Sequence, residues 1–89
     1  MRANKEKVTK LLRTARGQID GIIRMVEADQ YCIDIVNQLL ASDAILKKAM
    51  KEVMHGHITG CVSDAFSAGK EEQEEKINEI IGVFDKLSR

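Results

Sequence analysis

The chain contains no proline, and an apolar periodicity of helical type runs without a break from residue 31 to residue 67. Proline removes a backbone donor and disrupts a helix interior, so its absence allows very long helices to form. Hydrophobic residues make up 44% of the chain but aromatic residues only 3%, which favours packing of Leu, Ile and Ala between helices over a sheet. These features predict an all-α fold with one long central helix.

The periodicity divides into three helices, predicted at about residues 5–27, 31–67 and 71–87. Asp29 and Gln30 interrupt the pattern after the first helix, and Gly69 can end the second helix in a left-handed conformation. We expect a helix hairpin followed by a short C-terminal helix, all within a single domain that covers residues 1–89. Because a chain of this length buries only a marginal core, it is expected to oligomerise.

Three side chains suited to metal binding or thiol chemistry lie near the two ends of the predicted central helix. His57 and Cys61 are four residues apart, so in a helix they point from the same face and can reach one ion. Cys32 lies at the other end, roughly 37 Å from His57 at about 1.5 Å per residue. Gly56 and Gly60 lower the helix propensity around His57 and leave the continuity of the helix there open.

A second copy of the chain, packed antiparallel in a four-helix-bundle dimer, would bring Cys32 of one subunit against His57 and Cys61 of the other. The two-fold axis would cross near Ile45, and each dimer would hold two identical sites. Two thiolates and one imidazole form a soft, low-coordinate donor set that suits Cu(I), whereas Zn²⁺ normally takes a fourth ligand. The competing interpretation is that both cysteines are small buried hydrophobic residues and His57 is a surface residue.

The formal net charge is zero, from 14 basic and 14 acidic residues, but the charges are unevenly distributed. Residues 1–26 carry seven basic and two acidic residues, a net charge of +5. Such a segment, repeated over an oligomer, could neutralise DNA phosphates, although a solvated helix face is the commoner explanation. No helix-turn-helix, zinc finger or ribbon motif for reading DNA is present.

Other function classes find little support in the sequence. It has no Gly-rich phosphate loop and no Ser, His and Asp set, so we expect neither an enzyme nor a small-molecule substrate. No apolar run approaches membrane-spanning length and no signal peptide begins the chain, which predicts a cytoplasmic location without a membrane partner. Two distant cysteines in such a chain are more typical of ligands or redox-active thiols than of a structural disulfide.

Three stretches of the sequence resemble the copper-sensitive operon repressor (CsoR) family of small all-helical transcriptional regulators. They are Arg16-Gly17-Gln18-Ile19-Asp20-Gly21-Ile22, Tyr31-Cys32-Ile33-Asp34, and Val53-Met54-His55-Gly56-His57 with Cys61. The resemblance implies that Cys32, His57 and Cys61 bind Cu(I) between subunits, and that Tyr31 and Glu79 contact these ligands from outside.

The same resemblance implies a tetramer of two dimers that binds operator DNA in the absence of metal and releases it when Cu(I) binds. Five basic side chains would then contact DNA: Lys10, Arg13, Arg16, Arg24 and Lys48.

Sister branches of this family sense nickel or cobalt, formaldehyde, or persulfides. Cys61 argues against the nickel and formaldehyde branches, which change that position, and His57 favours copper because persulfide sensors generally lack the histidine. The alternative function is a persulfide-sensing repressor in which Cys32 and Cys61 of different subunits become bridged by sulfur. A third hypothesis is a helical scaffold protein without a DNA role, in which replacing both cysteines changes nothing.

Overall fold

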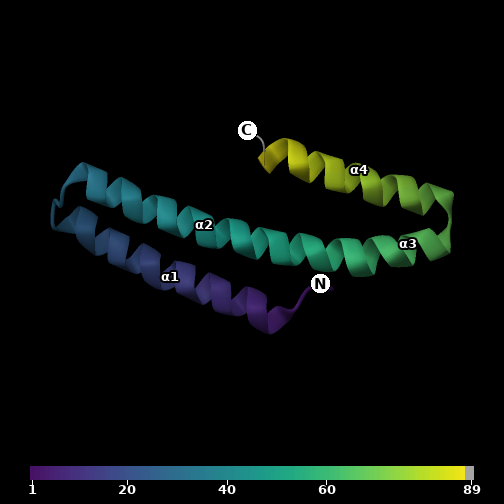
Figure 1. Cartoon of the computed structure of the whole chain (residues 1–89), viewed down its shortest axis with the longest axis horizontal. Helices are drawn as coiled ribbons and strands as arrows, with labels where there is room; N and C mark the ends of the chain where they lie inside the picture. The colour runs from purple at the N-terminus through teal and green to yellow at the C-terminus, as the bar shows by residue number, and fades with distance from the viewer. Residues whose placement is uncertain (88–89) are drawn as a thin grey trace.

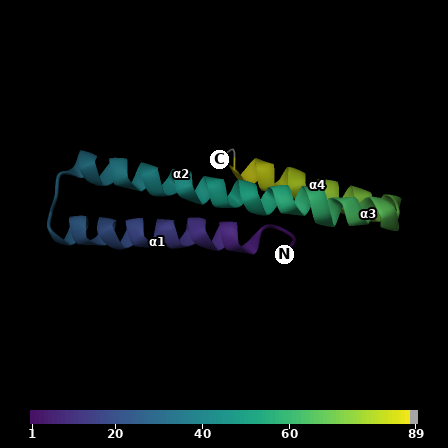
Figure 2. The ribbon, with the colours of Figure 1, turned by 60° about the horizontal axis from the view of Figure 1, so that its bottom comes forward.

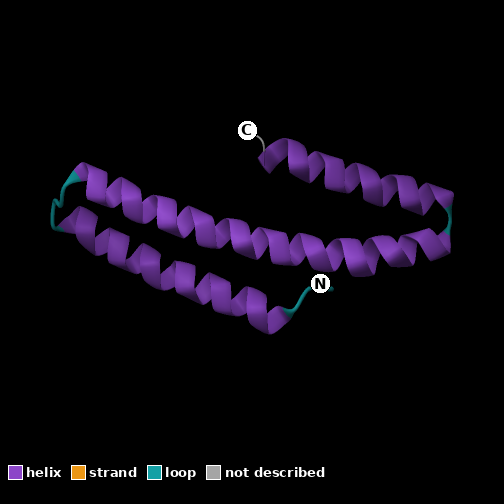
Figure 3. Ribbon diagram, in the orientation of Figure 1, coloured by secondary structure: helices purple, strands orange, loops and turns teal. Residues whose placement is uncertain are grey.

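The computed structural model describes residues 1–87, apart from the side chain of Val62, and this part of the chain is almost entirely helical (Figure 3). The helices in chain order are α1 (Lys5–Glu27), α2 (Cys32–Gly56), the π-helical segment η1 (His57–Val62), α3 (Ser63–Ala68) and α4 (Lys70–Leu87). The all-α class predicted from the sequence is confirmed. No helix within residues 1–87 combines the length and the apolar composition needed to span a bilayer.

Helices α1 and α2 form an antiparallel hairpin (Figure 1). The Asn4 side chain caps α1, because its Oδ1 accepts a hydrogen bond from the backbone N–H of Lys7 at 3.1 Å. The hairpin turn contains Asp29 with a φ of +53°, and Asp is one of the few non-glycine residues that tolerate this conformation. The interruption expected at Asp29 and Gln30 is therefore a tight helix-to-helix turn.

The two hairpin helices meet along a seam of small and apolar side chains spaced seven residues apart. The buried seam residues are Val8, Ala15 and Ile22 on α1, and Ser42, Ala49 and Gly56 on α2. A seven-residue repeat keeps one face of each helix toward the other. Two polar contacts help to fix the register: the Ser42 hydroxyl donates to Gln18 Oε1 at 3.0 Å, and Lys7 pairs with Glu52 at 2.9 Å.

Residues 32–68 form one continuous rod, the central rod, which consists of α2, η1 and α3 (Figure 1). We expected a single helix over residues 31–67. The rod instead begins one residue later, with Tyr31 as its N-cap, and it contains a π-helical turn at η1. A π-helix pairs residue i with i+5, so its turn is wider than that of the α-helix on either side. The central helix therefore continues through Gly56 and Gly60 without a break, but it changes from the α-helical to the π-helical form there.

The rod ends at Gly69, whose φ of +143° is unfavourable for any residue with a Cβ. The chain then reverses, so that α4 runs back beside the end of the rod (Figures 1 and 2). Within the described residues, α4 contacts α3 and η1 but not α2. The last helix is therefore attached to the rod through α3 and through η1, the segment that carries the predicted ligand residues His57 and Cys61.

A single chain leaves much of its apolar surface uncovered. On α1, the exposed large apolar residues are Leu12, Ile19, Ile23 and Val26. On α2, they include Val36, Leu39, Leu40, Leu46, Met50 and Val53. Exposed apolar surface of this extent is typical of a protein–protein interface and not of a stable monomer.

Candidate metal centre

His57 and Cys61 both lie in η1, at its first and fifth residues. In the wide π turn, four residues make slightly less than one full turn, so the two side chains still project from the same side of the rod. The His57 side chain is 27% exposed and the Cys61 thiol is free and half-buried. This arrangement leaves both donors accessible from one direction.

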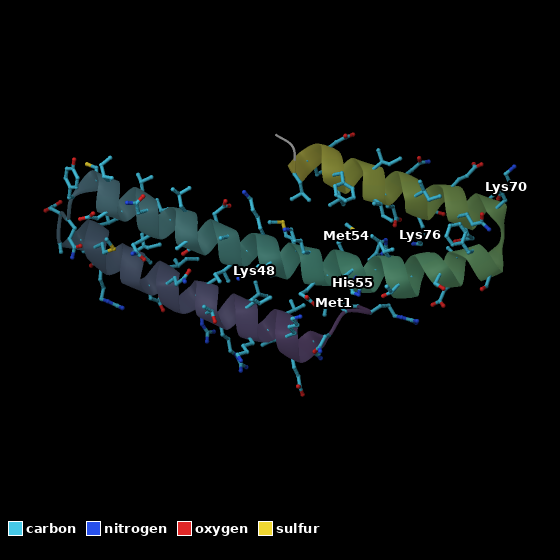
Figure 4. All side chains as sticks on the ribbon, viewed as in Figure 1. Met1, Lys48, Met54, His55, Lys70 and Lys76 are labelled. Carbon is cyan, nitrogen blue, oxygen red and sulfur yellow. The ribbon has the colours of Figure 1, made fainter. Side chains whose placement is uncertain are left out.

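Glu79 of α4 faces His57. Its Oε2 lies 3.7 Å from His57 Nε2, and its Oε1 lies 3.5 Å from the Lys76 ammonium. The first distance is longer than a hydrogen bond. In Figure 4, Lys76 lies on the side of α4 that faces the rod. With Nε2 turned toward Glu79, Nδ1 is the ring nitrogen of His57 that remains free for another ligand.

Cys32 and Tyr31 lie at the opposite end of α2, where both are exposed. Cys32 is the first residue of α2 and its thiol is free. At about 1.5 Å per residue, the two thiols are separated by roughly 43 Å along the rod. Accordingly, no three His, Cys, Asp or Glu side chains within residues 1–87 of one chain come close enough together to hold a metal ion.

The three predicted ligands nevertheless lie along one line of the rod, which we call the donor stripe. Its members alternate in spacings of four and three residues as far as His57: Cys32, Val36, Leu39, Asp43, Leu46, Met50, Val53, His57 and Cys61. This spacing keeps a stripe on one face of a helix. The five apolar members are all exposed, because α1 packs on the different face that carries Ser42, Ala49 and Gly56.

The five basic residues predicted to contact DNA are all exposed: Lys10, Arg13, Arg16, Arg24 and Lys48. Within residues 1–87, none of these five side chains forms an ion pair with a carboxylate. Lys10 and Arg13 line a shallow depression on α1 together with Glu6 and Thr9. The positive charge at these positions is therefore available to an external anion.

Lys48 lies near the groove between α2 and α1 (Figure 4). Lys7, Lys51 and Glu52 line the same groove. Lys7 could not be placed in this groove from the sequence, because its position there depends on the register of the hairpin. The Lys7 to Glu52 ion pair neutralises the single acidic residue of the groove.

Several known proteins are similar to this chain. The copper-sensing transcriptional repressor CsoR of Bacillus subtilis (strain 168) is 38% identical over 85 residues, which cover 96% of this chain and 82% of that protein. The copper-sensing transcriptional repressor CsoR of Mycobacterium ulcerans (strain Agy99) is 46% identical over 59 residues, which cover 66% of this chain and 50% of that protein.

A solved structure is also similar, with a TM-score of 0.86 and 28% identity. It is the copper-sensing repressor CsoR with Cu(I) from Geobacillus thermodenitrificans NG80-2, and the match covers 100% of this chain and 94% of that chain. The family model described as metal-sensitive transcriptional repressor matches residues 4–86. That match includes Cys32, His57 and Cys61 and covers every helix except the last residue of α4, so the chain belongs to the metal-sensitive transcriptional repressor family.

Proposed function

We propose that this protein is a Cu(I)-responsive transcriptional repressor, which binds operator DNA without the metal and releases it when Cu(I) binds at a site shared by two subunits. The observation that carries the proposal is the donor stripe, with Cys32 at one end of α2 and His57 and Cys61 just beyond the other. Similar proteins from Bacillus subtilis and Mycobacterium ulcerans are copper-sensing repressors.

The donor stripe requires a second copy of the chain in antiparallel orientation. Two rods packed along their stripes, with the two-fold axis near Ile45, would place Cys32 of each beside His57 and Cys61 of the other. The exposed apolar members of the stripe would be buried in that contact, as would the uncovered apolar face of α1. Two hairpins then form a four-helix bundle, and two such dimers form the proposed tetramer.

The donor set fits Cu(I) in its chemistry. Two thiolates and one imidazole nitrogen supply three soft ligands, and Cu(I) accepts such low-coordinate sites. Bound Cu(I) would supply strong, directional bonds between the ends of two rods. His57 would bind through Nδ1, since its Nε2 faces Glu79. A carboxylate beside the second ring nitrogen helps to orient the imidazole. Tyr31, next to Cys32, would contact the same site from the partner's side.

DNA binding is assigned to the exposed basic side chains named above. Their lack of ion pairs within the described part of the chain favours phosphate as their partner. Repeated over four subunits, they would neutralise many phosphates and produce strongly salt-dependent binding. A cytoplasmic location, where operator DNA is accessible, remains a prediction from the sequence.

Ligand binding would weaken DNA binding by changing the arrangement of the two hairpins. Binding of Cu(I) at a shared site would draw η1 of one subunit toward the start of α2 in the other. Because α1 packs on α2 of the same subunit, α1 would move with it. With a usual allosteric coupling of about 1–3 kcal/mol per site, operator affinity would fall about 5- to 150-fold for one site.

The decisive experiment is an anaerobic titration of the reduced protein on operator DNA, followed by fluorescence anisotropy. One arm receives chelator-buffered Cu(I) and the other a persulfide donor. We expect release at about one Cu(I) per subunit, loss of that response in His57→Ala, and a normal response in His55→Ala, whose side chain is exposed on the other side of the rod. Release by the persulfide donor alone, with His57→Ala behaving as wild type, would instead establish the sulfur-sensing alternative.

A further inference from the structure

Asp43 is the only carboxylate in the donor stripe, and its neighbours along the stripe are apolar. Its Oδ2 pairs with the Lys47 ammonium, one turn later on α2, at 3.0 Å, and both side chains are more than half exposed. Within residues 1–87, α2 packs laterally on α1 alone, so the middle of the stripe is uncovered (Figures 1 and 2). A charged pair therefore lies in the middle of a surface that is otherwise suited to packing against another helix.

The spacing of the stripe is the same in both directions along the chain. From Cys32 to His57, successive members are 4, 3, 4, 3, 4, 3 and 4 residues apart. In an antiparallel pair of rods that sets Cys32 opposite His57, every other member of this series also faces a member. The remaining facing pairs are Val36 with Val53, Leu39 with Met50, and Asp43 with Leu46. A single register thus fills every layer, in the seven-residue pattern of packed helix pairs.

That register places each Asp43 beside Lys47 of the second copy. Asp43 of one chain faces Leu46 of the other, and Lys47 is the next residue, only about 1.5 Å further along the rod. Lys47 lies about 40° around the helix from Asp43, at the edge of the stripe. Because the two-fold axis repeats the contact, two carboxylates and two ammonium groups surround the axis with alternating sign. A partner that covers them lowers the local dielectric and strengthens their attraction.

Other arrangements of two rods lose this complementarity. Sliding one rod by seven residues keeps the stripes in contact, but it sets Asp43 against Leu39 or Val53 and moves it at least about 9 Å along the rod from the other chain's Lys47. In a parallel pair, like charges would face each other at both positions. A carboxylate against an apolar side chain, or like charges in contact, is costly. The pair therefore favours one register, as single polar residues do in other helix pairs.

We propose that Asp43 and Lys47 form a four-residue charge cluster with the same two residues of a second copy, and that this cluster selects the antiparallel register in which the metal sites are complete. The proposal rests on the function proposed above and adds the residues by which the chain recognises an identical partner. The apolar layers supply most of the association, and the cluster supplies its specificity.

The first test is a charge swap in the reduced protein, without copper or DNA. Asp43→Lys surrounds the axis with four cations and Lys47→Asp with four anions, so each variant should associate at least about tenfold more weakly than the wild type in low salt. The double variant Asp43→Lys/Lys47→Asp restores the alternating charges and should recover association. Glu75→Lys makes the same change of charge at an exposed position of α4 and is the control. Sedimentation equilibrium measures association, and 1 M salt should reduce the differences.

The second test mixes the two single variants. In a mixed pair, two lysines of one chain face two aspartates of the other, so an equimolar mixture should recover the association that neither variant shows alone. Both positions are exposed and lie away from the hairpin seam of Ser42 and Ala49, and recovery on mixing would exclude misfolding as the cause of weak association. Single variants that associate like the wild type, or the absence of recovery in both the mixture and the double variant, would overturn the proposal.

The third measurement determines the register directly. Cys32 and Cys61 of one chain are roughly 43 Å apart along the rod, so a short bismaleimide can join them only between two chains. Peptide mass spectrometry of the cross-linked wild type should find Cys32 joined to Cys61, whereas a parallel pair would give Cys32 joined to Cys32. The parallel result would contradict the proposed function as well as the cluster. Cross-links between Cys32 and Cys61, together with charge variants that associate normally, would overturn the cluster alone and leave copper sensing intact.

Discussion

Nε2 of His57 lies 3.7 Å from Oε2 of Glu79, a contact that links η1 to the helix that returns along it. Lys76, one turn before Glu79 on the same helix, holds the other carboxylate oxygen at 3.5 Å. The carboxylate is thus shared between a predicted ligand and a cation. Within residues 1–87, α4 contacts only α3 and η1. The Glu79 carboxylate therefore links the position of α4 to the orientation of the His57 ring.

The first prediction concerns that carboxylate. Glu79→Gln keeps the size of the side chain and removes its charge, so the His57 ring loses the partner that orients it. We expect the affinity for Cu(I) to fall about 10- to 100-fold, as is usual for partners of metal ligands, while operator binding without copper stays unchanged. Competition with a chromophoric Cu(I) chelator measures the affinity. Glu75→Gln, an exposed position one turn earlier on α4, is the control and should bind Cu(I) normally.

The second prediction tests whether the site is shared between subunits. Cys32→Ser and Cys61→Ser should each abolish the three-coordinate site when alone. A mixed dimer of the two variants retains one complete site, from Cys32 of one chain and His57 with Cys61 of the other. Random mixing should therefore restore about a quarter of the wild-type Cu(I) stoichiometry. The measurement is Cu(I) titration after co-refolding; no recovery on mixing would argue against an intersubunit site.

Much of the fold could be predicted from the sequence because periodicity and the absence of proline determine it locally. The all-α class, the hairpin and the stop at Gly69 depend on such local signals. The family resemblance and the non-enzymatic regulatory function are confirmed by the family match. The ligand set, its partners Tyr31 and Glu79, and the DNA-contacting residues stay predictions, since their roles depend on a second chain and on DNA.

Two features could not be predicted from the sequence: the π turn at η1, and the packing of Arg2 and Ala3 against Gly60 and Gly56, which brings distant residues together. Gly56 and Gly60 indicate only a weak helix, and nothing local favours an i→i+5 turn over a bend. The reason for two small residues becomes visible once Arg2 and Ala3 are seen to lie against them. Two glycines four residues apart in a helix indicate that another segment can pack closely against the helix backbone. The spacing does not identify which segment that is.

The third prediction concerns the hairpin seam, on which the placement of α1 depends. Ala49 is 5% exposed and lies between α1 and α2. Ala49→Leu would overfill the seam and push the helices apart, which should lower the free energy of unfolding by about 1–3 kcal/mol. Ala41→Leu, at an exposed position of the same helix, should change it little. Urea denaturation followed by circular dichroism, at one fixed protein concentration, measures both; equal stability of the two variants would show that the seam is not close-packed.

The last prediction separates a phosphate-contacting lysine from its neighbour. Lys48 is exposed and borders the groove with Lys7 and Lys51, whereas Lys47 pairs with Asp43 at 3.0 Å. Lys48→Ala should weaken operator binding in the absence of copper and reduce the slope of log K against log salt by about 1 for each subunit that contacts a phosphate through it. Lys47→Ala removes the same charge from the adjacent position, so it controls for net charge and should leave the slope near that of the wild type. Anisotropy titrations at four or more salt concentrations measure the slopes of both variants. Equal slopes would mean that both lysines act through the overall electrostatic field of the protein and that Lys48 makes no phosphate contact.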